Sequence, residues 1–279
     1  MLKDKIIERI RKPYYRNVLS KAVTIFKPKY IIKIDEKTKN NLNELGKNNF
    51  LILPNLLNDS EVTSLREYFG GFKLYDRWRR DLGLFDLDSV SKETHVANIE
   101  TKAFIENRKI IELANHPMIL KYVANYLGCK PVLDTMDAWW SFPGHEHEEE
   151  AEYFHRDNDS LKFIKFFIYL TDVDINDGPH TLILGSRNSN KYLEMRKRYS
   201  DEEVDKIDKK ESWQIFIGKA GTNFIEDTYS LHKGSLPKTG KRLLLQFRYS
   251  IYPTIFSSKI PILEPSTSLD KYINQLYLK

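Results

Sequence analysis

Residues 153–173 read YFHRDNDSLKFIKFFIYLTDV, and this stretch decides the fold. Its second half, Leu161–Thr171, predicts a β-strand, because successive side chains of a strand point to opposite faces. One face is uniformly apolar and is expected to meet packed layers: Ile164, Phe166, Ile168 and Leu170. The other face mixes aromatic and polar residues, which is unusual for a plain core: Phe163, Lys165, Phe167, Tyr169 and Thr171.

The sequence pattern changes near Pro131, from mainly helical segments to short strands. Before it we expect a short strand ending at Pro54, helices over 58–69, 101–113 and 116–127, and a loop over 72–95. After it come short β-type runs: Asp137–Phe142, Tyr153–Asp157, Leu161–Thr171, His180–Leu184, Thr222–Asp227 and Arg242–Ile251. The capping-box pattern that begins at Ser200 predicts one helix among them. Helices followed by many strands indicate a mainly β fold, a sandwich or jelly roll with supporting helices.

We predict one domain over residues 1–279. Its parts are a basic N-terminal lead (1–48), a helical support (49–130), a jelly-roll core (131–255) and a C-terminal tail (256–279).

Composition narrows the class of protein. The chain is 41% hydrophobic and 30% charged, with 35 aromatic residues, so it can bury a large core and is not expected to be disordered. Apolar runs such as Phe166–Leu170 are far too short for a membrane helix. The first residues lack the apolar region of a signal peptide, and the single Cys129 excludes an intrachain disulfide. These features predict a soluble, cytoplasmic protein.

The positive charge is concentrated at one end. Residues 1–30 carry nine Lys or Arg against two acidic residues, whereas the rest of the chain is slightly negative. No nucleic-acid-binding surface is therefore expected. Val18, Ala22, Val23 and Phe26 have helical spacing, and Pro13 interrupts the pattern that precedes them. Two interpretations remain: a helix packed on the domain through its apolar stripe, or a surface helix attracted to anionic lipid or an anionic partner.

The sequence offers one candidate metal site. On a strand, His155 and Asp157 point to the same face and can occupy adjacent positions around a metal ion. Most His-x-Asp pairs are only surface or hydrogen-bonded pairs, so the pair alone is weak evidence. His232 is the best-placed third ligand from a distant strand. Two histidines and one carboxylate form the facial triad of non-haem Fe(II) oxygenases, which leaves positions open for cosubstrate and O2.

Arg242, ten residues after His232, strengthens this interpretation. A guanidinium at the start of a strand is suited to a bidentate grip on a carboxylate. An iron site that also binds 2-oxoglutarate needs such a cation for the carboxylate far from the metal. The alternative for Arg242 is an ordinary arginine at the edge of a sheet.

An ordered set of motifs now resembles a known family. It comprises Phe154-His155-Arg156-Asp157, Tyr169-Leu170-Thr171-Asp172-Val173, Gly178-Pro179-His180, Gly185-Ser186-Arg187, Gly221-Thr222, Asp227-Thr228, His232-Lys233-Gly234 and Arg242. Together these are similar to the phytanoyl-CoA dioxygenase superfamily, over roughly residues 131–250. The resemblance implies a double-stranded β-helix, which is a jelly-roll variant, and an Fe(II)- and 2-oxoglutarate-dependent oxygenase.

The resemblance also implies roles for residues. His155, Asp157 and His232 are expected to be the catalytic iron ligands, and Arg242 the anchor of 2-oxoglutarate. Lys165 is a further candidate for a cosubstrate carboxylate, with a lysine that extends to solvent as the alternative, and Ser235 is a weaker one. Many relatives have a histidine where Arg187 stands, but that position is not a metal ligand.

We therefore predict a hydroxylase that uses Fe(II), 2-oxoglutarate and O2 on an unactivated C–H bond of a small molecule. The natural-product, glycan and lipid classes all remain open for the substrate, and loops at 72–98, 143–152 and 186–212 are expected to select it. Two rivals remain: a non-catalytic jelly-roll module that binds a ligand, and a cupin-like metal enzyme that does not use 2-oxoglutarate.

Overall fold

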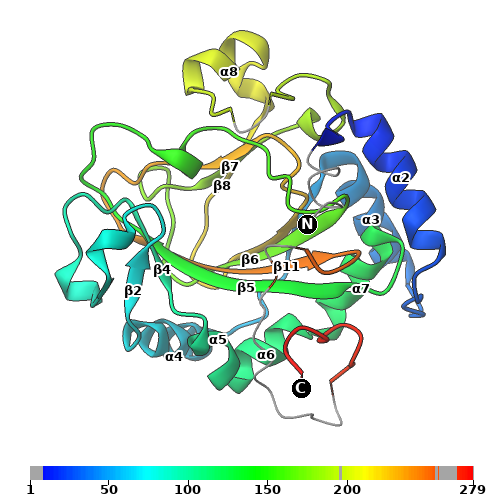
Figure 1. Cartoon of the computed structure of the whole chain (residues 1–279), viewed down its shortest axis with the longest axis horizontal. Helices are drawn as coiled ribbons and strands as arrows, with labels where there is room; N and C mark the ends of the chain where they lie inside the picture. Colours follow the sequence, from blue (N-terminus) through cyan, green and yellow to red (C-terminus); the bar gives the residue numbers. More distant parts are fainter. Residues whose placement is uncertain (1–8, 195–196, 255–256, 258–268, 279) are drawn as a thin grey trace.

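The structure is a computed structural model, and it describes residues 9–194, 197–254, 257 and 269–278. Two antiparallel sheets face each other (Figure 1). The larger has the order β1 (Phe50–Leu53), β9 (Asn223–Glu226), β6 (Phe163–Tyr169), β11 (Arg242–Ser250), β5 (Val132–Ser141), β4 (Val96–Ile99), β2 (Leu74–Asp76) and β3 (Leu84–Phe85). The smaller consists of β10 (His232–Gly234), β7 (His180–Ile183) and β8 (Trp213–Phe216). The predicted mainly β jelly-roll fold is confirmed.

Helices cover the outer face of the larger sheet. They are α3 (Glu36–Asn48), α4 (Asp59–Gly70), α5 (Lys102–Glu106), α6 (Arg108–Ala114) and α7 (Pro117–Leu127). Helix α2 (Pro13–Ile25) packs at one side of the roll against the loop after β7, and α8 (Asp201–Ile207) lies beyond the smaller sheet (Figure 1). The predicted N-caps of two helices are present: Asn58 closes a capping box at α4, and Ser200 closes another at α8. Within the described residues, no helix is long and apolar enough to cross a membrane.

Strand periodicity separates the two sides of the larger sheet. On β6, Ile164, Phe166 and Ile168 join the main core with the helices, as the alternation predicts. Phe167 and Tyr169 point the other way, into a second apolar cluster between the sheets. The inner face of the larger sheet is thus where polar residues such as Lys165 meet the smaller sheet.

Several expected elements differ from the structure. The predicted loop 72–95 contains β2, which pairs with β4 at the sheet edge. The predicted helix 101–113 is two helices, because Asn107 breaks the first and caps the second with its side chain. Helix α3 was not predicted, although Asp35 caps its first turn. Residues 258–268 of the predicted tail lie outside the described residues, but Ile273 and Tyr277 are buried in the main core.

The N-terminal helix also differs. The helical pattern breaks before Pro13, as predicted: Arg9 is helical, residues 10–12 are not, and Pro13 is the first residue of α2, where its missing N–H is not needed. The residues that α2 buries are Pro13, Arg16, Ser20 and Thr24. Of the predicted apolar stripe, Val18, Ala22 and Phe26 are exposed, and Val23 alone packs, half-buried, against the main core. The interpretation of a helix packed through its apolar stripe is therefore wrong.

A buried ion pair ties the loop after β7 to the helical layer. Arg187 Nε donates to Asp227 Oδ2 at 2.9 Å, and both side chains are almost fully buried. The Tyr126 hydroxyl, from α7, donates to the same oxygen at 2.5 Å. The Tyr229 amide donates to Asp227 Oδ1 at 3.0 Å. Arg187 therefore supports the backbone that leads from β9 to β10.

We predict that Arg187→Met destabilises the protein by about 3–5 kcal/mol, because it leaves the Asp227 carboxylate buried without its cation. Urea unfolding measures this change. Arg108→Met is the control, because that side chain is 93% exposed, and its effect should stay within about 0.5 kcal/mol. A loss below about 1 kcal/mol for Arg187→Met would show that the pair contributes little.

Candidate metal centre

The main chain brings two histidines together. The amide of His155 donates to the carbonyl of His232 at 2.9 Å, and the amide of His232 donates back to the carbonyl of His155 at 2.9 Å. The two ring centroids are 4.4 Å apart. The predicted strand Tyr153–Asp157 is not formed, because Phe154 and His155 make only isolated bridges with different partners, Tyr199 and His232. A single reciprocal bridge is nevertheless enough to place both imidazoles side by side.

Asp157 completes the cluster. Its amide donates to the Thr228 carbonyl at 3.0 Å, which turns the carboxylate toward the two rings. Asp157 Oδ1 lies 3.7 Å from His155 Nε2, and Oδ2 lies 3.5 Å from His232 Nε2. Among the described residues, these three form the one group of His, Cys, Asp or Glu whose ligand atoms all lie within 4.8 Å of one another.

The hydrogen bonds of the rings make the donor set fit a divalent metal. His155 Nδ1 lies 2.9 Å from the Tyr153 carbonyl, and His232 Nδ1 lies 2.9 Å from the Ser230 carbonyl. A carbonyl only accepts, so each Nδ1 carries the proton and each Nε2 offers its lone pair to the cluster. Two imidazole nitrogens and one carboxylate are the 2-His-1-carboxylate set that suits Fe(II) and leaves coordination positions open.

Electrostatics favour the metal-binding forms of His155 and Asp157 but act in the opposite direction on His232. Burial lowers the pKa of His155 well below its usual value, and His232 beside it adds to this shift. Desolvation opposes ionisation of Asp157, but Lys165 and His232 outweigh it and hold the pKa of that carboxyl well below its usual range. For His232, the Asp157 carboxylate outweighs burial and raises the pKa.

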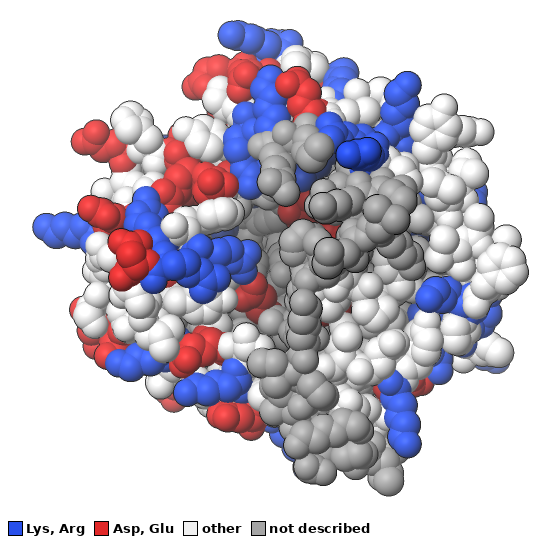
Figure 2. All heavy atoms as spheres, viewed as in Figure 1, with Lys and Arg blue, Asp and Glu red and all other residues white. Residues whose placement is uncertain are grey.

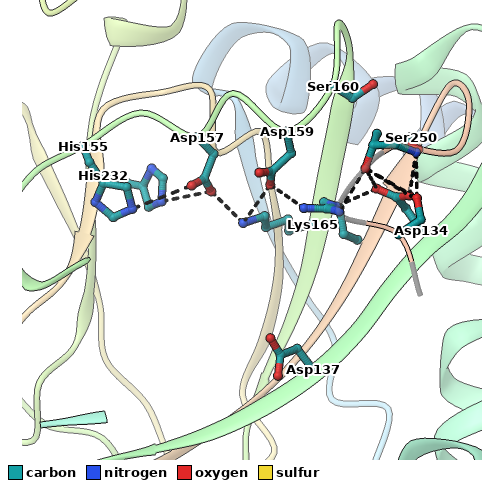
Figure 3. A network of polar contacts seen from close by, with 12 residues as sticks. Asp134, Asp137, His155, Asp157, Asp159, Ser160, Lys165, His232 and Ser250 are labelled. Atoms are coloured by element: carbon teal, nitrogen blue, oxygen red, sulfur yellow. Dashed lines mark hydrogen bonds and ion pairs between the residues drawn. The ribbon is translucent and has the colours of Figure 1, made fainter. Parts of the chain in front are cut away.

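Lys165 contacts a ligand carboxylate. Its Nζ lies 2.6 Å from Asp157 Oδ2 and 3.6 Å from Asp159 Oδ2. Arg248 also contacts Asp159, at 2.7 Å, and reaches Asp134 at 2.7 Å. Figure 3 shows Asp157, Asp159, Lys165 and Asp134 in this network. The alternative of a lysine that extends to solvent is wrong, because Lys165 is only 8% exposed. Its role toward a cosubstrate carboxylate stays a prediction.

Arg242 has a different environment. Its guanidinium donates to the Gly178 carbonyl and, at 3.1 Å, to Ser141 Oγ. Its Nε is buried without a hydrogen-bond partner among the described residues. No described carboxylate forms an ion pair with the group, although the Glu152 carboxylate is close enough to act on it electrostatically. Burial lowers the pKa of this guanidinium. A Cβ on Gly234 would lie 3.0 Å from Nη2, so glycine at that position leaves room for the guanidinium.

Ser235 borders the same segment. Its amide donates to the Pro179 carbonyl at 3.0 Å, and its hydroxyl lies 3.3 Å from Thr181 Oγ1. Ser235, directly after β10, and Arg242, at the start of β11, thus both contact Gly178-Pro179. This arrangement places two of the three candidates for cosubstrate binding in one part of the roll.

Two polar pairs beside the site were not predicted. His180 Nε2 lies 2.7 Å from Glu226 Oε2, and the His180 ring stacks on His232 with centroids 5.3 Å apart. Burial raises the pKa of Glu226 to about 8 and lowers that of His180, so both groups favour their neutral forms. The alternation of residues along the strands could have identified Glu226 as a residue near the site, because Glu226 pairs with Lys165 across β9 and β6.

The second pair lies in the predicted selecting loop 143–152. His95 Nδ1 lies 2.8 Å from Glu152 Oε2, and burial raises the pKa of Glu152 to about 7. The ring of His145 stacks on His95 at 3.5 Å. This loop therefore packs against the strand-end residue His95 rather than being solvated along its whole length, and sequence alone gave no sign of that partner.

Comparisons with known proteins give the family and the fold. The family model described as Phytanoyl-CoA dioxygenase (PhyH) matches residues 47–242, more than half of the chain. A comparison with curated protein sequences gives no match.

Three solved structures illustrate the likeness of fold. HygX from Streptomyces hygroscopicus, with nickel and 2-oxoglutarate bound, is 16% identical with a TM-score of 0.57, covering 86% of this chain and 94% of HygX. EctD from S. alaskensis, in its apoform, is 14% identical with a TM-score of 0.56, covering 91% and 90%. The epimerase SnoN, with Fe3+, alpha ketoglutarate and nogalamycin RO, is 16% identical with a TM-score of 0.52, covering 84% and 92%.

We predict that His155→Ala or His232→Ala abolishes stoichiometric binding of Fe(II), because an open site with three protein ligands does not tolerate the loss of an imidazole. Anaerobic metal titration measures binding, and circular dichroism checks that the fold is retained. His147→Ala is the control, since His147 lies outside the cluster. Full metal binding by either ligand variant would contradict the assignment.

Proposed function

The chain belongs to the phytanoyl-CoA dioxygenase family, and from this premise we propose that it is an Fe(II)- and 2-oxoglutarate-dependent oxygenase that hydroxylates a C–H bond of a small molecule. The observation that carries the proposal is the cluster of His155, Asp157 and His232, whose ligand atoms lie within 4.8 Å of one another. Bound Fe(II) supplies O2 activation coupled to decarboxylation of 2-oxoglutarate to succinate and CO2.

The residues of the chain prepare this chemistry before any ligand arrives. Backbone carbonyls fix both imidazoles with Nε2 toward the cluster, and the Lys165 ammonium keeps Asp157 ionised. The three ligand atoms are thus arranged at little further cost in conformational entropy. Because they occupy one side of a coordination sphere, the remaining positions are open to cosubstrate and O2.

Arg242 is the proposed anchor for the distal carboxylate of 2-oxoglutarate. A buried guanidinium that contacts only neutral groups still carries its desolvation penalty, and an incoming carboxylate removes much of that penalty. The fork of N–H donors suits a bidentate carboxylate. Ser235 lies close to the same segment and offers a hydroxyl to the same group.

Hydroxylation is the proposed outcome because Asp157 is present. A halogenating relative needs a vacant position on iron where this carboxylate would bind, and here the carboxylate lies between the two histidines. The fold itself does not select the outcome, since the epimerase SnoN shares it. The proposal therefore depends on the ligand set of this chain.

A small molecule is the proposed class of substrate. Solved structures of two proteins of similar fold contain such molecules: hygromycin B in HygX and nogalamycin RO in SnoN. In this chain the loop over 143–152 packs on His95, directly before β4, and we propose that this loop contacts the substrate.

The proposal predicts that the protein forms succinate from 2-oxoglutarate when Fe(II) and O2 are present. Without a substrate this reaction should be slow, and a substrate found by screening metabolite pools should make it faster. Asp157→Gly should lower this rate by more than about 100-fold at saturating iron, which exceeds the loss expected for a residue that only orients a ligand. Asp59→Gly is the control, because it removes an exposed carboxylate of α4 that lies outside the cluster, and it should leave the rate unchanged.

The outcomes separate the rivals. A ligand-binding module would form no succinate under any condition. A cupin-like metal enzyme would bind the metal through the same three residues without decarboxylating 2-oxoglutarate. Activity of Asp157→Gly within about 100-fold of wild type would remove Asp157 from the metal ligands.

For Arg242→Ala we predict a 2-oxoglutarate requirement at least about 30-fold higher, because loss of a buried charge-assisted pair costs about 2–5 kcal/mol. Metal affinity should not change. Steady-state rates against 2-oxoglutarate concentration measure the effect, and Arg108→Ala, at an exposed site on α6, is the control. An unchanged requirement would move the anchor to Arg248 or Lys165.

A further inference from the structure

Helix α2 packs on the protein with its polar side. Arg16, Ser20 and Thr24, spaced four residues apart, are buried against the body. The apolar residues at the alternative helical spacing face outward, with Tyr14 71%, Ile25 69% and Phe26 89% exposed. Val18 and Leu19 lie between them on the same outward face and are also exposed. An ordinary surface helix of a globular protein has the opposite arrangement.

Arg16 fixes this orientation. Its guanidinium lies over the Tyr229 ring, 4.1 Å from the centroid, and donates to Asn158 Oδ1 at 2.5 Å, to the Ile10 carbonyl at 3.0 Å and to the Ser160 carbonyl. A rotation of α2 that buried Phe26 would take a charged group out of all these contacts. The apolar face therefore remains exposed as long as α2 is docked.

The exposed face continues beyond the helix. Eight of the fifteen exposed large hydrophobic side chains of the described chain lie between residues 14 and 34: Tyr14, Tyr15, Val18, Leu19, Ile25, Phe26, Ile31 and Ile34. Figure 2 shows uncharged side chains gathered over α2, at the right of the view, with blue Lys and Arg atoms around them and the red carboxylates mostly on the other side. We call residues 9–34 the N-terminal face.

The positive charge of this face indicates an anionic partner. Residues 9–34 contain eight Lys or Arg and no Asp or Glu. Beside the start of α2, Arg9, Arg11 and Lys12 line a hollow of about 620 Å³ whose other walls include Tyr15, Val18 and Leu19. Cations beside an apolar wall match the headgroup and acyl-chain region of an anionic lipid. A second copy of the chain would bring the same positive charge and be repelled.

We propose that the N-terminal face is a peripheral docking surface for bilayers that contain anionic lipid. Tyr14, Ile25 and Phe26 insert into the headgroup region, and Lys12 and Lys21, at the edges of the apolar face, contact lipid phosphates. This surface contains none of the candidate metal ligands, and the proposal does not depend on the proposed function.

Vesicle flotation of the full-length protein tests the proposal. We expect binding to vesicles of phosphatidylcholine mixed with phosphatidylglycerol, weaker binding at high salt, and little binding to phosphatidylcholine alone. Ile25→Ser/Phe26→Ser should weaken binding at least about tenfold through loss of apolar burial. Lys12→Gln/Lys21→Gln should weaken it about 25-fold, at roughly fivefold per charge near the surface.

Two matched controls keep the result interpretable. Ile175→Ser/Ile217→Ser changes two isoleucines that are each 58% exposed elsewhere, and Lys37→Gln/Lys39→Gln removes two exposed charges from α3. Both should bind vesicles as the wild type does. All four variants should keep the wild-type thermal unfolding temperature and rate of succinate formation, because none touches the metal centre.

Three results would overturn the proposal. Equal binding to neutral and anionic vesicles, or none to either, would exclude an anionic bilayer as the partner. Loss of binding only in the lysine variant would indicate a polyanion that does not use the apolar face. Dimers in sedimentation analysis that Ile25→Ser/Phe26→Ser abolishes would assign the face to a second copy of the chain.

Discussion

The metal centre depends on a charge conflict inside the roll. Lys165 on β6 and Arg248 on β11 are directly opposite in the strand register, and both are buried. Like charges at such positions repel each other, and burial strengthens the repulsion. Asp159 lies within ion-pair distance of both, and Asp157 contacts Lys165 (Figure 3). The two strands therefore need the acidic segment 157–159, and this requirement places the ligand carboxylate beside the histidines.

Arg242 differs from Arg248 in its partners. On β11, Arg242 and Arg248 point to the same inner face, since they are separated by an even number of residues. Arg248 has two carboxylate partners, whereas Arg242 donates to a carbonyl and a hydroxyl. Of two buried guanidinium groups on one strand face, one has two carboxylate partners, and the other forms no ion pair with a described residue. This difference, rather than the motif alone, supports a carboxylate ligand at Arg242.

The sequence predicted the features that depend on local periodicity, such as strand faces and helix caps. It did not predict the features that depend on contacts with residues distant in the chain. The faces of β6 followed from its alternation, and the caps of α4 and α8 from Asn58 and Ser200. Strand phase placed Lys165 on the inner face but could not show which anion it meets, because Asp159 reaches it through a loop. The segment 153–157 has the pattern of a strand, yet its backbone forms only isolated β-bridges.

Helix α2 shows most clearly how a tertiary contact overrides periodicity. Its spacing left open whether Val18 and Phe26 are buried, and the buried Arg16 decides the orientation through acceptors that include Asn158 and Ser160. These residues directly follow Asp157, so the segment that carries the ligand carboxylate also holds the helix. Any ligand that binds only the folded arrangement of this segment stabilises it by mass action. Because α2 docks on the same segment, loading of the metal centre and retention of the outward-facing helix are linked thermodynamically.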